Sequence, residues 1–282
     1  MEETTMPPRV SIGMPVYNGA KFIREALESL LEQTFTDFEL IISDNASTDG
    51  TELICREYAA RDKRIRYVRW PENRGALANF NFVLFESVGE YFMWNACDDI
   101  RSLDYLELNC YFLDRNLEYV ASTSPTRYEG RSFDQERMGD GALEGAKSAR
   151  ISNFFGYWHA NGRFYSLFRS SILKKNIFLK HDFLGSDWAI VLGVISEGKT
   201  MRLNQGYLVL GRSGFSNSGK ILKHYRQSSI HYVIPFIDLI KSVVLICSGC
   251  SFFVKIKIFK DLFKLNMLAV KASVFCQIKF KF

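Results

Sequence analysis

The sequence predicts an α/β fold in which a mostly parallel sheet is flanked by helices. Strand-like and helix-like segments alternate from residue 9 to residue 125, which is typical of parallel strands joined by helical crossovers. The chain has 282 residues, of which 47% are hydrophobic, so it can form one large domain with an appendage. Polar residues gather where the predicted strands end, and open α/β sheets bind their ligands at that edge.

The predicted elements follow one another closely as far as residue 125. Each strand is a short apolar run, and each helix has apolar residues three or four positions apart. Ser47 or Thr48 is expected to cap the second helix. The strands are expected at residues 9–16, 38–43, 64–69, 91–96 and 119–123, and the helices at 20–33, 48–60, 75–88 and 102–115.

Residues 126–150 break this rhythm, because they are rich in Gly, Arg, Glu and Asp and contain few large apolar residues. We interpret them as a mobile excursion near the binding edge. Regular structure is expected to return afterwards, as a helix at 151–158, a strand at 164–168, a helix at 187–197 and a strand at 201–210. We place a first domain at residues 1–218 and a tail at residues 219–282.

The tail differs from the rest of the chain in charge. The whole chain has a net charge of +5, whereas residues 220–282 contain eleven Lys or Arg and two acids, a net of +9. Apolar clusters alternate with single lysines, a pattern that favours a helix lying on an anionic membrane surface. The longest uncharged run, residues 242–254, is shorter than the roughly twenty residues that span a bilayer. An oligomerisation surface and a helical layer packed on the first domain are the two alternatives.

Cysteine usage and the N-terminus bear on location. The six cysteines are scattered, which is typical of free thiols in a reducing compartment. Residues 1–9 lack the apolar core of a signal peptide. We therefore expect a cytoplasmic protein that lies peripherally at the inner face of the cell membrane, and we expect no nucleic-acid partner.

Four polar motifs fall at the ends of the first four predicted strands or just beyond them. Each has a simpler interpretation as a turn or a helix cap, but together at one edge they form a polar crevice. Adjacent carboxylates repel each other, so a pair is costly unless a cation or a donor-rich partner neutralises it. A divalent cation that holds a diphosphate would do so. The motifs are Pro15-Val16-Tyr17-Asn18, the run from Asp44 to Gly50, Glu72-Asn73-Arg74-Gly75 and Asp98-Asp99.

These motifs resemble those of the family 2 glycosyltransferases, whose catalytic domain has the GT-A fold. Members of that family show a PVYN-type strand end, a DxGSTDGT-type loop, an NxG turn with a later Asn, and an acidic metal motif after GEY and an apolar strand. The resemblance covers roughly residues 9–215. The corresponding residues here are Pro15 to Asn18, Asp44 to Thr51, Asn73 to Gly75 with Asn81, and Gly89-Glu90-Tyr91 leading to Asp98-Asp99.

The resemblance implies an inverting transfer of a sugar from a nucleoside-diphosphate sugar to an acceptor hydroxyl, in the synthesis of a cell-surface polysaccharide or a lipid-linked glycan. It implies a donor half at residues 9–125 and an acceptor half at 126–218. Asp99 is implied to hold Mn²⁺ or Mg²⁺, and Asp187 to act as the general base that opens a late helix. Residues 212–216 could close over the diphosphate. The implied donor-binding residues are Pro15, Val16, Tyr17, Asn18, Asp44, Asn73, Gly75, Asn81 and Asp98.

The sequence departs from the family pattern at four places. The loop after the second strand reads Asp44-Asn45-Ala46 where Asp-Asp-Gly is common. Ala96 stands where the first Asp of the usual DxDD motif would be, Phe80 replaces an Arg, and Ser186 replaces the Glu of the usual ED motif. The missing Asp motivates a second hypothesis, a catalytically inactive nucleotide-sugar-binding or scaffold protein of the same fold. A sugar nucleotidyltransferase is a third and weaker alternative, because the loop after the first strand lacks that class's Gly- and Arg-rich sequence. Assembly of the chain into a homo-oligomer stays an open alternative.

Overall fold

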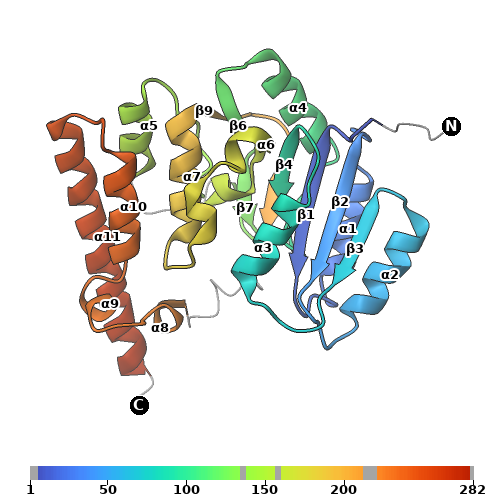
Figure 1. Cartoon of the computed structure of the whole chain (residues 1–282), viewed down its shortest axis with the longest axis horizontal. Coiled ribbons are helices and arrows are strands. Elements are labelled where there is room, and N and C mark those ends of the chain that lie inside the picture. The colour runs from blue at the N-terminus through green and yellow to red at the C-terminus, as the bar shows by residue number, and fades with distance from the viewer. Residues whose placement is uncertain (1–5, 134–137, 156–159, 212–220, 280–282) are drawn as a thin grey trace.

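The computed structural model describes residues 6–133, 138–155, 160–211 and 221–279, and for residues 272–279 it describes the backbone alone. Figure 1 shows a central sheet flanked by helices, and beside it a layer of helices from the C-terminal part of the chain. The predicted α/β class with a mostly parallel sheet is confirmed.

Among the described residues, seven strands form the main sheet in the order β3-β2-β1-β4-β8-β6-β9. Neighbouring strands pair in parallel except β8, which runs antiparallel to β4 and β6. Both β1 and β4 are buried along their whole length, as expected for strands covered on both faces. The strands are β1 (Val10–Val16), β2 (Phe38–Asp44), β3 (Ile65–Arg69), β4 (Tyr91–Trp94), β6 (Tyr119–Thr123), β8 (Leu167–Arg169) and β9 (Lys199–Arg202).

The helices between these strands lie within the predicted ranges, give or take a residue, and are shorter. They are α1 (Ile23–Leu31), α2 (Thr51–Arg61), α3 (Ala76–Phe85) and α4 (Tyr105–Arg115). The predicted cap of α2 is wrong, because the helix begins at Thr51 with Gly50 at its N-cap and no side-chain cap. Ser47 and Thr48 instead bond to Asn18 in the preceding loop.

The predicted strand at residues 201–210 is also wrong as a single strand. β9 ends at Arg202, and β10 (Leu208–Leu210) belongs to a second, three-stranded sheet. Gly206, between them, has a φ of +67°, which turns the chain. β10 pairs with β5 (Ile100–Arg101) and β7 (Thr126–Tyr128). The two-residue β5 was not predicted, because it is too short to give a sequence pattern.

The predicted excursion at residues 126–150 contains more regular structure than expected. Besides β7, it holds the start of α5 (Lys147–Phe154), and the buried Leu143 pairs with Thr200 beside the main sheet. The predicted strand at 164–168 is in part a short helix, η1 (Gly162–Tyr165), that precedes β8. Residues 134–137 and 156–159 lie outside the described residues. The remaining elements here are α6 (Ser170–Leu173), η2 (Ile177–Lys180) and α7 (Ser186–Glu197).

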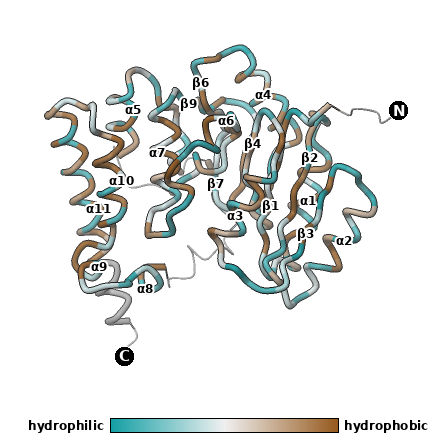
Figure 2. The backbone as a smooth tube through the Cα atoms, in the orientation of Figure 1, coloured by the Kyte–Doolittle hydropathy of each residue, from teal (hydrophilic) through white to brown (hydrophobic). Residues whose placement is uncertain are grey.

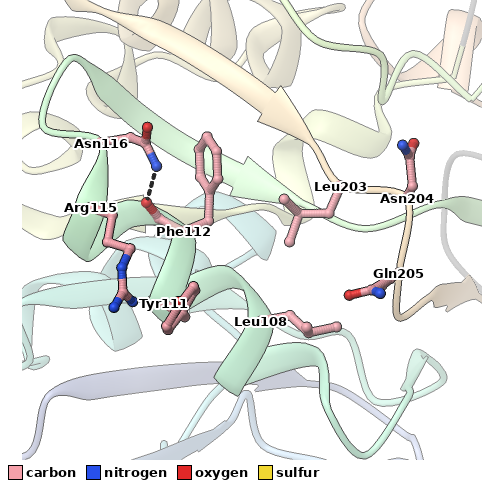
Figure 3. A pocket seen from close by; sticks show the side chains of 8 residues that line it. All are labelled: Leu108, Tyr111, Phe112, Arg115, Asn116, Leu203, Asn204 and Gln205. Atoms are coloured by element: carbon pink, nitrogen blue, oxygen red, sulfur yellow. Dashed lines mark hydrogen bonds between the residues drawn. The ribbon is translucent and has the colours of Figure 1, made fainter.

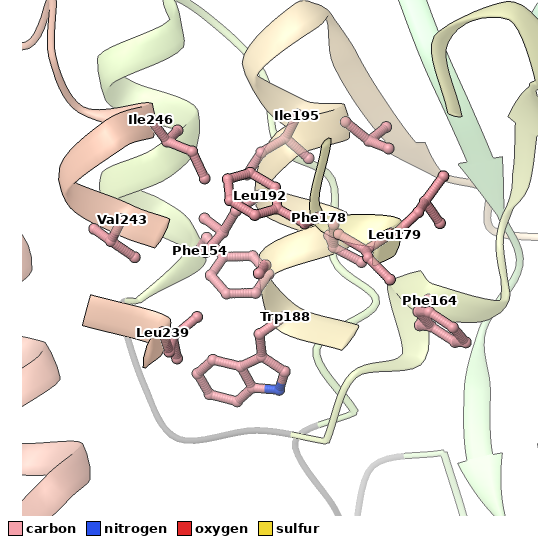
Figure 4. Close-up of a cluster of buried hydrophobic side chains, with 14 of the residues drawn as sticks. Phe154, Phe164, Phe178, Leu179, Trp188, Leu192, Ile195, Leu239, Val243 and Ile246 are labelled. Atoms are coloured by element: carbon pink, nitrogen blue, oxygen red, sulfur yellow. The ribbon is translucent and has the colours of Figure 1, made fainter. Parts of the chain in front are cut away.

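The tail forms a helical layer packed on the first domain. It consists of α8 (Ile221–His224), α9 (Ile230–Val233), α10 (Ile237–Ile246) and α11 (Phe252–Lys279). α10 contacts α7, and α11 contacts α5. Figure 4 shows Leu239 and Val243 of α10 beside Phe154, Trp188 and Leu192, all in one buried cluster.

Of the three interpretations of the tail, the helical layer packed on the first domain is confirmed by these contacts. The membrane surface and the oligomerisation surface stay open for the exposed face of the tail. The proposed boundary near residue 218 falls outside the described residues. Within the described part of the chain, no helix has both the length and the apolarity that crossing a bilayer requires.

Candidate active site

The carboxyl ends of the parallel strands meet at one edge of the sheet. The register pairs Pro15 with Ser43, Val16 with Asp44, and Asp44 with Arg69. Pro15 and Val16 are buried at the end of β1, whereas Tyr17 beyond them is half exposed. In Figure 1 the loops that follow β1, β2 and β3 lie together at this edge. The sequence prediction of a shared polar edge is therefore confirmed for these strands.

The loops after β1 and β2 are hydrogen bonded to each other through Asn18. The Asn18 N–H donates to Ser47 Oγ over 2.9 Å, and Asn18 Oδ1 accepts from the Thr48 N–H over 2.8 Å. Asn18 has a φ of +54°, a conformation that Asn tolerates better than most residues. Asn18 thus holds the two loops in a fixed relation.

Asp44 is fully buried and shapes the loop after β2. Its Oδ1 accepts from the Ser47 N–H over 2.8 Å, and its Oδ2 accepts from Tyr67 Oη over 2.7 Å. Burial, and then the hydrogen bond to Asp44, raise the pKa of Tyr67. Each carboxylate oxygen keeps a second lone pair, and a nucleobase contact by Asp44 stays a prediction.

Asn45 and Asn73 build the turn before α3. Asn45 Nδ2 donates to Asn73 Oδ1 over 2.9 Å and to the Gly75 carbonyl over 3.2 Å. Gly75 has a φ of +83° and open space where a Cβ would stand, so glycine fits the turn and leaves room for a ligand. The guanidinium of Arg74 lies 3.9 Å from the centre of the Trp70 ring, and a phosphate contact by Arg74 stays a hypothesis.

Two asparagines of α3 have different roles. Asn79 is buried and donates from Nδ2 to the carbonyls of Ser43 (3.0 Å) and Val16 (3.3 Å), so it fastens the ends of β1 and β2. Asn81, the predicted donor-binding residue, donates to the Leu179 carbonyl over 2.7 Å. Asn81 therefore ties α3 to η2, and its contact with a donor stays a prediction. Sequence reasoning missed Asn79, although it lies two residues before Asn81.

The acidic pair follows β4, as predicted, and Asp99 is the buried member. Asp99 is 2% exposed, and its Oδ1 accepts from the Gly211 N–H over 3.0 Å while its Oδ2 accepts from the Ala96 N–H over 3.2 Å. Burial, and then the negative charge of the neighbouring Asp98, raise the pKa of Asp99 to about 7. Asp98 is half-buried. A positive charge brought to this pair would be strongly stabilised.

A buried arginine, which sequence reasoning missed, supports the acidic pair. Arg101 is 1% exposed, and its Nε donates to Asn95 Oδ1 over 2.7 Å. Its Nη2 donates to the carbonyls of Trp94 (2.9 Å) and Tyr165 (3.0 Å). Asn95 in turn donates to the Asp99 carbonyl over 3.1 Å. The charge of Arg101 lowers the pKa of Asp99, and so opposes part of the effect of burial.

These residues fit a divalent cation whose ligands come partly from the protein and partly from a bound substrate. Within the described ranges, no group of three or more His, Cys, Asp or Glu side chains could hold a metal by itself. Mg²⁺ is usually held in proteins by one or two carboxylates, with phosphate oxygens and waters as the other ligands. Asp98 and Asp99 can supply those carboxylates, and a cation bound to them would offset the repulsion between their charges.

Asp187 lies in the first turn of α7 and is partly buried. It accepts a hydrogen bond from Asn161 Nδ2 over 2.9 Å. Burial raises the pKa of Asp187, and the bond from Asn161 opposes part of that rise. A carboxylate with a raised pKa is a better proton acceptor than an exposed aspartate. Asn161 was not predicted, because it lies 26 positions before Asp187 in the chain and so gives no local signal.

Tyr165 lies within electrostatic reach of both the acidic pair and Asp187. It ends η1, which contacts both β4 and α7. Burial raises the pKa of Tyr165 well above its usual value, and the charges of Asp99, Asp98 and Asp187 add to the rise in that order. The sequence prediction placed Tyr165 inside a strand and so missed it.

A surface hollow of about 390 Å³ lies apart from these residues. It is formed by α4 and the turn at residues 203–205, and Figure 3 shows Arg115 and Tyr111 at one side of it. None of the predicted site residues lines this hollow. We therefore place the candidate site at the sheet edge with Asp99.

The sequence matches the family model described as Glycosyl transferase family 2 over residues 11–177. Among curated relatives, EpsE of Bacillus subtilis, provisionally named a glycosyltransferase, is 35% identical over 113 residues, which are 40% of this chain and 41% of EpsE. TuaG of the same species, provisionally named a teichuronic acid biosynthesis glycosyltransferase, is 36% identical over 110 residues, 39% of this chain and 44% of TuaG. The matched part of the chain thus spans less than half the length of these relatives.

Solved structures share the fold. The TarS fragment of S. aureus in complex with UDP-GlcNAc has a TM-score of 0.60 at 18% identity, covering 93% of this chain and 81% of that chain. The mannosyltransferase PcManGT of Pyrobaculum calidifontis, in complex with GDP-Man and Mn²⁺, has a TM-score of 0.57 at 18% identity, covering 98% of this chain and 80% of that chain. At this level of identity the likeness shows the fold alone.

Proposed function

The chain belongs to glycosyl transferase family 2, and on this premise we propose that it is an inverting glycosyltransferase. It moves a sugar from a nucleoside-diphosphate sugar to an acceptor hydroxyl, in the synthesis of a cell-surface polysaccharide or a lipid-linked glycan. The observation that carries the proposal is the buried Asp99 beside Asp98 at the sheet edge, with Asp187 within electrostatic reach of the same Tyr165 as this pair. The names of TuaG and of the two nucleotide-sugar complexes support the choice of donor and pathway.

We assign donor binding to the sheet edge, within residues 9–125. The nucleoside lies along the loops that Asn18, Asp44 and Asn73 hold together, with the open space at Gly75 beside it. Asp99 would hold Mn²⁺ or Mg²⁺ together with the diphosphate, and Asp98 beside it would contact the donor. The cation, when bound, neutralises the charge that develops on the leaving nucleoside diphosphate.

Asp187 acts as the general base in the acceptor half, residues 126–218. It takes the proton of the acceptor hydroxyl while the acceptor oxygen bonds to the anomeric carbon, and the bond from that carbon to the phosphate oxygen breaks. Attack from the side opposite the leaving group inverts the anomeric configuration. Asn161 orients the Asp187 carboxylate through its 2.9 Å hydrogen bond.

The alternative is a protein that binds a nucleotide sugar without transferring it. The observation that favours it is the absence of a third acidic ligand near Asp99 in the described part of the chain. The two functions differ in whether the nucleoside diphosphate is released from the sugar.

A panel of nucleoside diphosphates and their sugars, with and without Mn²⁺, tests the proposal. We expect one nucleoside diphosphate to raise the melting temperature only when Mn²⁺ is present, since a ligand at 100 times its Kd stabilises the folded state by about 2.7 kcal/mol. The matching nucleotide sugar is expected to be hydrolysed slowly without acceptor. Binding without any release would favour the non-catalytic alternative, and no binding by any member would contradict both functions.

Replacing Gly211 with alanine is expected to weaken Mn²⁺-dependent donor binding at least about tenfold. A Cβ at Gly211 would lie 2.1 Å from Asp98 Oδ2 and 2.5 Å from Asp98 Cβ. Asp98 or the Gly211 backbone must therefore move, and we expect this movement to break the hydrogen bond from the Gly211 N–H to Asp99. The loss of one charge-assisted hydrogen bond is worth about 1.5–3 kcal/mol, which is tenfold or more. Calorimetric titration measures the change, with Gly249→Ala as the control because a Cβ there meets open space. Equal affinity in both variants would remove Gly211 from the site.

A further inference from the structure

Part of the exposed surface of α11 is apolar, although the helix already buries another apolar face. Ile258, Leu262, Leu265 and Ala269 recur at helical spacing and are buried against the rest of the chain. These residues form the apolar face through which α11 packs on the rest of the chain. The large apolar side chains on the rest of its surface therefore need a separate explanation.

These exposed side chains form one stripe, which we call the outer stripe of α11. Phe252 and Phe253, at the start of the helix, are 72% and 82% exposed. Ile256, Phe263 and Met267 follow at intervals of three to seven residues and are each at least 44% exposed, so they share the side of the helix turned away from the buried face. An exposed apolar patch of this kind marks an interaction surface.

A row of lysines borders the outer stripe. Lys257, Lys260, Lys264 and Lys271 are exposed and lie at intervals of three, four and seven residues, so they occupy the adjacent side of the helix. Asp261 is the only acid among residues 252–279, and it lies 3.5 Å from Lys264. A hollow of about 330 Å³ lies where stripe and lysines meet, lined by Phe263, Met267, Leu268 and two of these lysines.

The position of α11 leaves this face open. Figure 1 shows α11 at the end of the molecule farthest from β3, and Figure 2 shows hydrophobic and hydrophilic residues alternating along it. On α10, Val244 and Leu245 are also apolar and more than half exposed.

We propose that the outer stripe of α11 and its lysines bind the surface of an anionic lipid bilayer, with the helix lying in the plane of the surface. Aromatic and aliphatic side chains then enter the boundary between headgroups and acyl chains, and the lysines meet the anionic headgroups. A second copy of this chain fits less well, because a symmetric contact would bring two rows of lysines together. The proposal does not depend on the activity proposed for the site.

Sedimentation of the full chain with lipid vesicles tests this proposal. We expect binding to vesicles of 30% phosphatidylglycerol in phosphatidylcholine, and at least tenfold weaker binding to pure phosphatidylcholine. Half-molar salt is expected to weaken the binding, because it screens the lysines. Equal binding to both kinds of vesicle, or no binding to either, would overturn the proposal.

Paired variants locate the contact. Reversing three charges (Lys257→Glu, Lys260→Glu and Lys271→Glu) is expected to lower vesicle affinity about 100-fold or more, at roughly fivefold for each lysine. Phe253→Ser with Phe263→Ser is expected to abolish binding. Controls with equally exposed residues elsewhere, Lys63→Glu and Leu117→Ser, are expected to bind as the unchanged chain does.

Two further measurements keep the outcomes distinct. Melting temperatures of the α11 variants without ligand are expected to equal that of the unchanged chain, so weaker vesicle binding would not come from unfolding. Vesicle binding is measured without nucleotide, so a failure of the catalytic proposal would leave this test intact. Analytical ultracentrifugation reports self-association. A dimer that dissociates in the Phe253→Ser, Phe263→Ser variant would show that a second copy, and not a bilayer, covers the stripe.

Discussion

Replacing Asp99 with asparagine is expected to lower kcat/KM by about 10²–10³-fold, the usual loss when one electrostatic stabiliser of a leaving group is removed. A neutral amide cannot compete for a hard divalent cation as a carboxylate does. Donor binding is expected to lose its dependence on Mn²⁺ as well. Release of the nucleoside diphosphate in the presence of acceptor, followed at several Mn²⁺ concentrations, measures both effects.

The stability of the Asp99→Asn variant must be measured alongside its activity. Both carboxylate oxygens accept from backbone N–H groups, so the amide nitrogen of asparagine must face one of those donors. We expect a cost of about 1–3 kcal/mol in the free energy of unfolding. Asp37→Asn, at an exposed position, is the matched control. Turnover by Asp99→Asn equal to that of the control would remove the assigned role of Asp99.

Replacing Asp187 with asparagine is expected to lower kcat by about 10²–10⁴-fold, the usual contribution of a general base. The Kd for the nucleoside diphosphate is expected to stay unchanged, because the base acts on the acceptor and not on the donor. This division between kcat and donor Kd separates Asp187 from Asp99. A variant that loses donor affinity but keeps kcat would contradict the assignment.

The pH profile of the unchanged chain provides an independent check on Asp187. A base acts in its deprotonated form, so the rate falls as the pH drops through the pKa of Asp187. Because burial raises that pKa, the acidic limb is expected at a higher pH than an exposed aspartate would give. Asn161→Ala removes a hydrogen bond that lowers the pKa, so it is expected to move the limb to still higher pH. A limb that does not move would show that another group titrates.

The part of the site that the sequence predicts well depends on strands that are neighbours in the sheet. Parallel pairing puts Val16 beside Asp44, so polar residues after successive strands must meet. The position of Asp99 follows in the same way from β4, which pairs with β1. These inferences need only the alternation of strands and helices and the direction of the strands.

The residues that sequence reasoning missed reach the site from far along the chain. Gly211 donates to Asp99 across 112 positions, and Arg101 donates to the Tyr165 carbonyl across 64. No local pattern encodes such contacts, because they arise when β5 and β10 pair and when η1 packs between β4 and α7. Gly211 could have been noticed only as a glycine that directly follows an apolar strand.

The tail shows a different limit of sequence reasoning. Apolar residues of α11 recur at helical spacing on two sides, with Leu262 on one and Phe263 on the other. Periodicity can show that such a helix has two apolar sides, but not which of them the fold buries. That choice depends on α5, which α11 contacts in the fold although the two helices lie far apart in the sequence.

The crystal structure of the chain with its nucleoside diphosphate and Mn²⁺ tests the central claim most directly. We expect anomalous density for Mn²⁺ about 2 Å from a carboxylate oxygen of Asp99, the distance typical of small divalent cations, with the diphosphate on the other side of the ion. A nucleotide bound away from the ends of β1, β2 and β4, or an Asp99 carboxylate without manganese while the nucleotide is present, would contradict the claim.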